Sequence, residues 1–563
     1  MKFSQIPYKR PSIEAYATTF LALLTQFDKA DSFLEQDSIF QKLYEHRDEF
    51  DTMFQLAQMK CDADTTNEAM QDETGYFNTV LPKTEELETA FYKSLVKAQF
   101  KDQLKEKWGA HIFNIASNKI KGFSPEIMDD LVQENQLSSE YTRVIGSISI
   151  ELNGKDYNLT GLEKLFVDKD RSIRKKASSA KWNALAEKQE KLDSIYDDLV
   201  NVRHKMARKL GFENFIELRY IKMDRIDYNP EMVATFREQV IKHIGPIVQK
   251  LNNRHKKRLG YDHIFEYDRQ FQFNSGDPSP KYQPEEILKK GRDMYASLSV
   301  ETEEFFNHMM KNELLDVINR PGKAMAAYCW ELSKYRHPYI FACFNGTSND
   351  IKVLTHEAGH AFQYYCSREA LIEYRWPSFE AAEIHAMSME YLTYPWMNNF
   401  FNEDVEKYFF SHISKSMNSL LFNCSGDHFQ HIVYENPTMT PNERATVWRD
   451  LEKNYLPTKD FDDCDFLENG RYWQWIRHLY KYPFYLIDYA LAQICALQYW
   501  QKNQKDKNGA WADYLNICKA GGTLPFLELV KKGNLRSPFD PGCVQMVAES
   551  VDKYLDSIDD SNF

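Results

Sequence analysis

The sequence predicts a mainly α-helical protein with a small amount of β structure. Apolar residues recur at helical spacing through long, highly charged stretches, whereas the alternation typical of strands is confined to two short stretches. The chain has 563 residues, of which 43% are hydrophobic and 27% charged, so it can bury a large core. We therefore expect helices to build most of the fold and short β elements to occupy two places along the chain.

The first 160 residues are expected to form an N-terminal helical subdomain that ends in a β-hairpin. Residues 12–108 carry charged faces between apolar positions, such as Leu87, Phe91 and Leu95 at four-residue spacing. Residues 148–159 then alternate with period two on both sides of Asn153-Gly154. Because Asn and Gly both tolerate a positive φ, this pair predicts a type I′ turn.

Helical patterns resume after the hairpin. Residues 168–210 are interpreted as one charged helix that closes at Gly211, and residues 230–258 as a second long helix. Residues 274–280 are rich in Gly, Pro and Ser and predict a loop. A further helix is expected to begin at Pro284, since proline is tolerated in a first helical turn.

The second β element is expected at residues 339–344, a short aromatic stretch that stops at Asn345-Gly346-Thr347. Two interpretations of this strand stay open. As an edge strand it would pair with an extended peptide through main-chain hydrogen bonds. As an ordinary core strand it would only deliver the chain to the helix that follows.

That following helix contains the motif with the clearest chemistry, His356-Glu357-Ala358-Gly359-His360. On a 3.6-residue period the two histidines project from one face, one turn apart, which lets both imidazoles reach a single metal ion. Glu357 lies about 100° round the helix, where it can meet a metal-bound water without being a ligand. Gly359 costs about 1 kcal/mol relative to alanine inside a helix, so we expect another segment to pack closely there.

Two histidines leave a catalytic zinc ion one protein ligand short. A second predicted helix downstream offers four candidates, and their spacing does not choose among them: Glu380, Glu383, His385 and Glu390. Glu383 and Glu390 share a helix face, so one can bind the metal while the other supports it from behind. For His385 a structural or supporting position is favoured over ligation.

A later segment carries polar rings at intervals of four, three and four residues: His478, Tyr482, Tyr485 and Tyr489. In one helix these side chains would form a single stripe, although Pro483 suggests that the helix begins near that residue. Donors of this kind can bind the oxyanion that develops during peptide hydrolysis. The alternative is an aromatic core stripe.

Composition limits the partners and the compartment. A net charge of −13 argues against nucleic acid or an anionic membrane, because such partners are bound by Lys and Arg. The N-terminus shows no leader pattern, no long apolar run is present, and nine scattered cysteines fit reduced thiols. We therefore expect a cytoplasmic protein, whose oligomeric state composition does not reveal.

The sequence resembles the oligoendopeptidase F branch of the thimet-oligopeptidase-like (M3) metallopeptidases in four stretches: residues 345–347, the run from Val353 to Gln363, residues 383–385 and residues 388–390. The resemblance implies one zinc ion per chain on His356, His360 and Glu383, with Glu390 as a supporting residue. It also implies two helical lobes that enclose a deep substrate channel, with residues 161–563 as the catalytic domain. The channel would admit flexible peptides and exclude folded proteins.

The activity implied by this resemblance is hydrolysis of internal bonds in short unstructured oligopeptides, with Glu357 as general base on a zinc-activated water. Tyr489 is the preferred oxyanion donor, followed by His478 and Tyr482 and then by Tyr485. Two alternatives stay open, a zinc carboxypeptidase and a non-catalytic peptide-binding protein. The ligand set also accepts manganese or cobalt.

Overall fold

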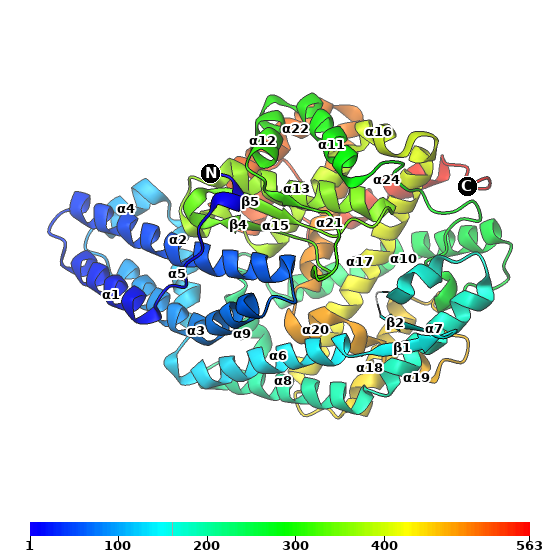
Figure 1. The fold of residues 1–563 in the computed structure, drawn as a ribbon, viewed down its shortest axis with the longest axis horizontal. Coiled ribbons are helices and arrows are strands. Elements are labelled where there is room, and N and C mark those ends of the chain that lie inside the picture. Colours follow the sequence, from blue (N-terminus) through cyan, green and yellow to red (C-terminus); the bar gives the residue numbers. More distant parts are fainter. Residues whose placement is uncertain (160) are drawn as a thin grey trace.

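The computed structural model describes residues 1–159 and 161–563, and most of them lie in α-helices (Figure 1). The mainly α fold predicted from the sequence is confirmed. A first group of helices projects at one side of the molecule and has its own hydrophobic core. Its members are α1 (Ile13–Lys29), α2 (Phe33–Ala63), α3 (Glu68–Val96), α4 (Lys101–Trp108) and α5 (His111–Lys121).

The predicted hairpin follows helix α6 (Met128–Gly146) and consists of β1 (Ser149–Leu152) and β2 (Lys155–Asn158). Asn153 and Gly154 have φ values of 55° and 73°, so both turn residues adopt the conformation that a type I′ turn requires. Ile150 is buried in the larger of the two main hydrophobic cores, not in the core of α1 to α5. The domain division at residue 160 stays a prediction.

The single helix predicted over residues 168–210 is wrong, because the structure has two helices there. They are α7 (Arg171–Ala186) and α8 (Gln189–Lys209). No Gly or Pro marks the break, and its cause is tertiary, since α7 packs against β1 while α8 packs against α6. Helices α9 (Phe215–Lys222) and α10 (Pro230–Leu259) follow, and α10 matches the predicted second long helix.

A three-stranded sheet lies beside the helix that carries the histidine motif. Its order is β3 (Leu315–Asp316), β5 (His337–Phe341) and β4 (Tyr328–Leu332). Strand β5 is the central strand, parallel to β3 and antiparallel to β4, and all five of its residues are buried. The edge-strand interpretation of residues 339–344 is therefore wrong, and β4 provides the edge instead.

The larger core is built around three helices that pack side by side, with α15 between α13 and α21. These are α13 (Ser348–Ser367), α15 (Phe379–Leu392) and α21 (Leu486–Lys505). Long helix α17 (Val405–Glu435) packs against both α10 and α21. The remaining helices are α11 (Pro284–Leu298), α12 (Val300–Lys311), α14 (Ile372–Arg375), α16 (Asn398–Phe401), α18 (Pro441–Tyr455), α19 (Asp465–Glu468), α20 (Arg477–Lys481), α22 (Lys507–Ala520), α23 (Phe526–Lys532) and α24 (Cys543–Asp556).

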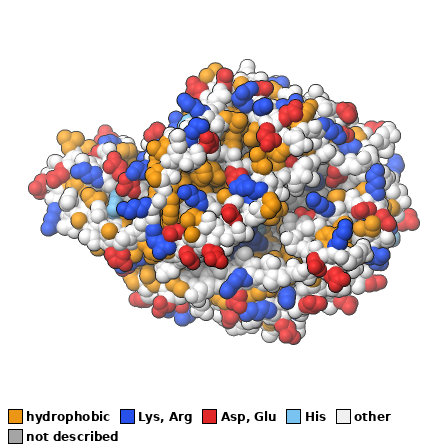
Figure 2. Space-filling view, in the orientation of Figure 1, with side chains coloured by type: hydrophobic (Ala, Val, Ile, Leu, Met, Phe, Trp, Pro, Cys, Tyr) orange, Lys and Arg blue, Asp and Glu red, His pale blue; other side chains and the backbone are white. Residues whose placement is uncertain are grey.

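The surface is hollowed near the centre of the face shown in Figure 2, between the region of α6 and α8 and the region of α13 and α15. Orange apolar atoms gather beside this hollow, and charged side chains of both signs cover the rest of the face. Among the described residues, none of the helices combines the length and the hydropathy that a bilayer crossing needs.

Candidate metal and catalytic site

Helix α13 begins at a turn that its own first residues organise. The Asp350 carboxylate accepts hydrogen bonds from the backbone N–H groups of Asn345, at 2.9 Å, and Gly346, at 2.7 Å. Gly346 has a φ of 86°, which favours glycine. This turn connects central strand β5 to α13, so the histidine motif starts from a fixed point at the end of the sheet.

His356 and His360 of α13 meet Glu383 of α15. The Nε2 atoms of the two histidines lie 3.4 and 3.8 Å from Glu383 Oε2, and the ligand atoms of all three residues lie within 4.8 Å of one another. In a tetrahedral zinc site, bonds of about 2.0 to 2.2 Å separate the ligand atoms by about 3.3 Å. The three side chains are thus arranged closely enough to share one ion.

The chemistry of these donors also fits a cation. Glu383 Oε2 is buried and has no hydrogen-bond partner among the described residues, although such a buried carboxylate oxygen is normally paired. Burial lowers the pKa of His360 to about 4, so this imidazole is neutral and has a free lone pair. Burial also disfavours charge on His356, but the nearby carboxylates of Glu383 and Glu390 outweigh it and raise its pKa to about 10. Metal binding must therefore release a proton from His356.

A chain of buried polar side chains holds His356 from behind. His356 Nδ1 lies 2.7 Å from Glu390 Oε1, and Glu390 Oε2 lies 2.6 Å from His412 Nε2. The Tyr394 hydroxyl lies 2.6 Å from His412 Nδ1. Although burial opposes ionisation of Glu390, the Lys352 charge and the two histidines hold its pKa well below the usual range. An ionised Glu390 holds one proton of His356 on Nδ1, so the proton that metal binding would release is the one on Nε2, which faces Glu383.

Replacing Glu390 by glutamine is expected to weaken metal binding by about 10–100-fold, the usual effect of removing such a partner. The glutamine amide is neutral and has only one acceptor oxygen, so it cannot accept hydrogen bonds from both histidines. The ring of His356 then loses its fixed tautomer and orientation. Chelator competition followed by metal analysis measures the change. Metal affinity equal to that of the parent protein would contradict the role assigned to Glu390.

Gly359 allows α13 and α15 to approach each other beside His356, His360 and Glu383. A Cβ atom at this position would lie 2.6 Å from both Ala386 Cα and the His385 carbonyl oxygen. Both atoms belong to the backbone of α15 and cannot move aside without moving the helix. The close packing expected from this helical glycine is confirmed, and it brings Glu383 toward the histidines.

The variant Gly359→Ala is expected to lower the free energy of unfolding by up to about 2 kcal/mol, because overpacking usually costs about 1–3 kcal/mol. The gain in helix propensity of about 1 kcal/mol offsets part of that cost. Gly75→Ala on α3 is the matched control, because a Cβ there meets nothing within 4 Å. The control should be as stable as the parent or slightly more stable. Thermal unfolding of both variants tests the prediction, and a stabilised Gly359→Ala variant would contradict it.

Glu357 lies next to the ligand set but does not join it. Its side chain is buried, and burial, with the charges of Glu383 and Glu390, raises its pKa to about 7 against the opposing charge of His356. The backbone of Cys329, on edge strand β4, also favours the carboxylate. The carboxyl group of Glu357 thus sits between the ligands and the free edge of the sheet.

The segment from His478 to Tyr489 does not form one continuous helical stripe, and the helix start that the sequence indicated near Pro483 is confirmed. Short helix α20 ends at Lys481, α21 begins at Leu486, and Phe484 between them has a φ of 63°. Pro483 cannot donate the backbone hydrogen bond that a continuous helix needs, and the chain turns there. The rings still gather in space, because the centre of the His478 ring lies 6.0 Å from Tyr482 and Tyr485 and 5.8 Å from Tyr489.

Each tyrosine of this segment has a different environment. The Tyr485 hydroxyl donates a hydrogen bond of 2.8 Å to Glu383 Oε1, so it contacts the ligand itself. Burial and then the charges of Glu383 and Glu357 raise the pKa of Tyr489, which keeps this phenol protonated beside both carboxylates. Tyr482 is 42% exposed at the rim of the group. Burial and the charge of Arg477 lower the pKa of His478 to about 4, so its imidazole is neutral.

Two other candidates from the second helix point elsewhere. Glu380 accepts a hydrogen bond from Ser378 at 3.0 Å, and burial together with the Asp488 charge raises its pKa to about 8. His385 is fully buried, and its Nδ1 lies 2.7 Å from the Ala381 carbonyl oxygen of its own helix. Sequence reasoning missed His412 and Tyr394, and no motif pointed to them.

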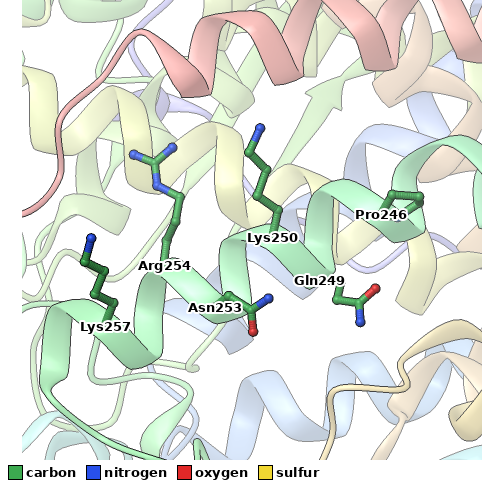
Figure 3. Close-up of a pocket in the computed structure, with 6 residues that line it drawn as sticks. All are labelled: Pro246, Gln249, Lys250, Asn253, Arg254 and Lys257. Carbon is green, nitrogen blue, oxygen red and sulfur yellow. The ribbon is translucent and has the colours of Figure 1, made fainter.

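A separate groove runs along α10 and is shown in Figure 3. It is lined by Pro246, Gln249, Lys250, Asn253, Arg254 and Lys257. Lys250 is paired with Asp552 and Arg254 with Asp560, so these cations already have carboxylate partners. The groove shares no residue with the ligand set or the tyrosine segment, and we assign it no role.

The fold is mainly helical, and one helix carries the histidine pair while a neighbouring helix brings a glutamate to it. This arrangement is typical of the metallopeptidase class. Residues 165–548 match the family model of peptidase family M3, and residues 3–123 match that of the peptidase M3 N-terminal domain. The chain therefore belongs to peptidase family M3, in its oligoendopeptidase F branch. The resemblance noted in the sequence is confirmed, and the chain is a metallo-oligopeptidase.

Individual relatives agree with this assignment. The chain is 22% identical over 565 residues to oligopeptidase PepF of Bacillus subtilis, covering 93% of this chain and 81% of that one. It is 23% identical to an oligoendopeptidase F homolog of Borreliella burgdorferi, covering 86% and 84% of the two chains. The solved structure of PZ peptidase A with an inhibitor superposes with a TM-score of 0.96 at 46% identity and covers 100% of both chains.

Proposed function

We propose that this protein is a zinc-dependent endopeptidase that hydrolyses internal bonds of short unstructured oligopeptides. One observation carries the proposal: the buried Glu383 Oε2, without a partner among the described residues, faces the Nε2 atoms of both histidines of the motif. His356, His360 and Glu383 would hold one zinc ion. Bound zinc would supply Lewis-acid chemistry, polarising the scissile carbonyl and making water a better nucleophile at neutral pH.

The side chains of this protein would then handle the protons and the developing charge. Glu357 accepts a proton from the attacking water and later delivers it to the departing amine. Its raised pKa, about 7, suits a group that must both accept and donate a proton near neutral pH. Tyr489, held protonated beside Glu357 and Glu383, donates a hydrogen bond to the carbonyl oxygen as it gains negative charge.

The extended form of the substrate follows from the edge of the sheet. Strand β4 leaves one side unpaired in the described sheet, and the backbone of its residue Cys329 approaches Glu357. A peptide that adds to this edge as a further strand would place its backbone, whatever its side chains, beside the general base. A flexible peptide can adopt that extended form, whereas a folded protein has its backbone already paired.

The nine cysteines are all free, which supports a reducing compartment such as the cytoplasm.

A timed digest of a mixed peptide library, followed by mass spectrometry, tests the proposal. A folded protein serves as a control substrate, and parallel samples contain a chelator. We expect internal cuts in peptides only, abolished by the chelator and restored by added zinc. Equal cutting of the folded protein, or undiminished activity after the metal is removed, would overturn it.

Phenylalanine variants of Tyr489 and Tyr485 are expected to differ. Tyr489→Phe should lower kcat by about 10²–10³-fold with metal content unchanged, the usual cost of losing one oxyanion donor. Tyr485→Phe removes the hydrogen bond to Glu383, so it should weaken metal retention as well. Steady-state kinetics and metal analysis on both variants separate the two roles. If Tyr489→Phe keeps the kcat of the parent, another donor holds the oxyanion.

A carboxypeptidase stays the second candidate because two cations flank the exposed Tyr482. The charged groups of Arg477 and Lys481 lie 5.7 and 5.9 Å from the centre of its ring. Burial and the charge of Arg477 lower the Lys481 pKa to about 8. A free peptide carboxylate would relieve this repulsion. An internally quenched peptide blocked at both ends decides between the two, since only an endopeptidase cleaves it.

A further inference from the structure

The segment that carries His478, Tyr482 and Tyr485 is held from behind by three arginines, which we call the arginine cradle: Arg203, Arg219 and Arg225. Each donates to a backbone carbonyl group of the segment. Arg203 Nη2 lies 2.6 Å from the Tyr480 oxygen, Arg219 Nε lies 2.9 Å from the Pro483 oxygen, and Arg225 Nη2 lies 2.6 Å from the Phe484 oxygen. The donors come from α8, α9 and the chain after α9, far from this segment in sequence.

The segment needs such support because its own hydrogen bonding is poor. Helix α20 has only five residues, so most of its carbonyl groups lack a helical partner. Phe484 has a left-handed backbone, which is unfavourable for a bulky residue, and Pro483 has no N–H to donate. Side chains satisfy both backbone groups of Phe484, because its N–H donates to Gln430 Oε1 at 2.8 Å and its carbonyl accepts from Arg225.

Arg225 has a second contact that links the turn to the next helix. The same Nη2 atom lies 2.6 Å from Asp488 Oδ1, and both side chains are fully buried. Asp488 is in the first turn of α21 and directly precedes Tyr489. One guanidinium group thus ties together the residue before Tyr485 and the residue before Tyr489. Tyr485 in turn contacts the ligand Glu383.

We propose that Arg225 is a positioning residue for peptide hydrolysis, which acts by fixing Tyr485 and Tyr489 in place. It contacts the backbone of Phe484 and the carboxylate of Asp488 and is not itself a catalytic group. The inference rests on the proposed function, because it assigns the two tyrosines to the reacting carbonyl and to the metal ligand. Arg203 and Arg219 support the same segment at its other carbonyl groups.

The test compares Arg225→Lys with a matched control, Arg174→Lys on α7. Arg174 is also fully buried, and it also joins a backbone carbonyl, that of Asp168, to a buried aspartate, Asp268. Lysine keeps the positive charge in both variants but cannot make both contacts with a fixed planar group. The control therefore measures the loss of stability that follows replacement of a buried arginine that does not contact the tyrosine segment.

Arg225→Lys is expected to lower kcat by about 10²-fold, the scale of a small misplacement of catalytic groups, while KM stays near that of the parent. Its metal should also be lost more readily in chelator competition, since Tyr485 no longer steadies Glu383. Arg174→Lys should match it in loss of thermal stability but keep the parent kcat and metal affinity. Equal kcat values for the parent and Arg225→Lys, at full metal content, would overturn the inference.

A second variant keeps the test decisive if Arg225→Lys does not fold. Arg219→Gln changes a half-buried side chain and removes its charge together with its bond to the Pro483 carbonyl. A reduced kcat with unchanged KM supports the cradle, and an unchanged kcat overturns it. The parent enzyme is assayed alongside with blocked peptides. A parent that cleaves no peptide refutes the proposed function, whereas an active parent with equally active variants refutes only the role of the arginines.

Discussion

Replacing Glu357 by glutamine is expected to lower kcat by about 10²–10⁴-fold while the protein keeps its metal. Glutamine has nearly the same size as glutamate but cannot accept a proton. The side-chain atoms that could hold a metal ion belong to His356, His360 and Glu383, and Glu357 is not among these three residues. Metal analysis and steady-state kinetics on the same sample measure both halves of the prediction.

Added zinc should not restore the Glu357→Gln variant, because the lost group is the base and not a ligand. Glu380→Gln is a suitable control, since Glu380 is also buried and burial with the Asp488 charge raises its pKa to about 8. Its side chain is therefore largely protonated at neutral pH, and glutamine resembles that form. A Glu357→Gln protein that cleaves peptides at the parent rate would refute the assignment of the general base.

Replacing Glu383 by glutamine is expected to cause the largest loss of metal. The change removes the negative charge from the only carboxylate in the ligand set that the structure assembles. The loss of metal affinity should be larger than the decrease of about 10–100-fold that follows removal of a supporting partner. Activity should fall in parallel and return in part when zinc is added in excess. This recovery distinguishes the ligand variant from Glu357→Gln.

Thermal unfolding gives an independent measure of the same site. A ligand that binds only the folded state stabilises it by about 2.7 kcal/mol at one hundred times its Kd. The Tm of the parent should therefore rise when zinc is added to chelator-treated protein, and that of Glu383→Gln should rise much less. Glu380→Gln, on the same helix but bonded to Ser378, should respond like the parent. An equal zinc response in parent and Glu383→Gln would show that Glu383 does not bind the ion.

Local patterns in the sequence were sufficient where one segment decides its own structure. Asn153-Gly154 predicted a hairpin because few other pairs tolerate two positive φ values, and both residues have them. The spacing of His356 and His360 predicted one shared helix face, and the structure has both on α13. The helical Gly359 predicted a close neighbour, because a glycine that weakens its helix needs a compensating contact.

The same reasoning failed where distant segments decide the outcome. The sequence of residues 339–344 is equally compatible with an edge strand and with a core strand. Only the pairing of β5 with both β3 and β4 distinguishes the two interpretations. The rings of His478, Tyr485 and Tyr489 gather through a turn at Phe484, not through one helix. Donors more than 250 residues away satisfy that turn, so no local period reveals it.

The sequence by itself predicted the helical class, one shared helix face for His356 and His360, and Glu357 as general base, and, through family resemblance, a glutamate on the second helix as a third ligand. Only the tertiary structure decided how that helix faces the histidines: Glu383 lies toward them, Glu390 contacts His356 Nδ1, and Glu380 is bonded to Ser378 instead. The physical reason is that helical spacing fixes which residues share a face of α15. Which face meets α13 depends on the packing at Gly359, where two backbones touch.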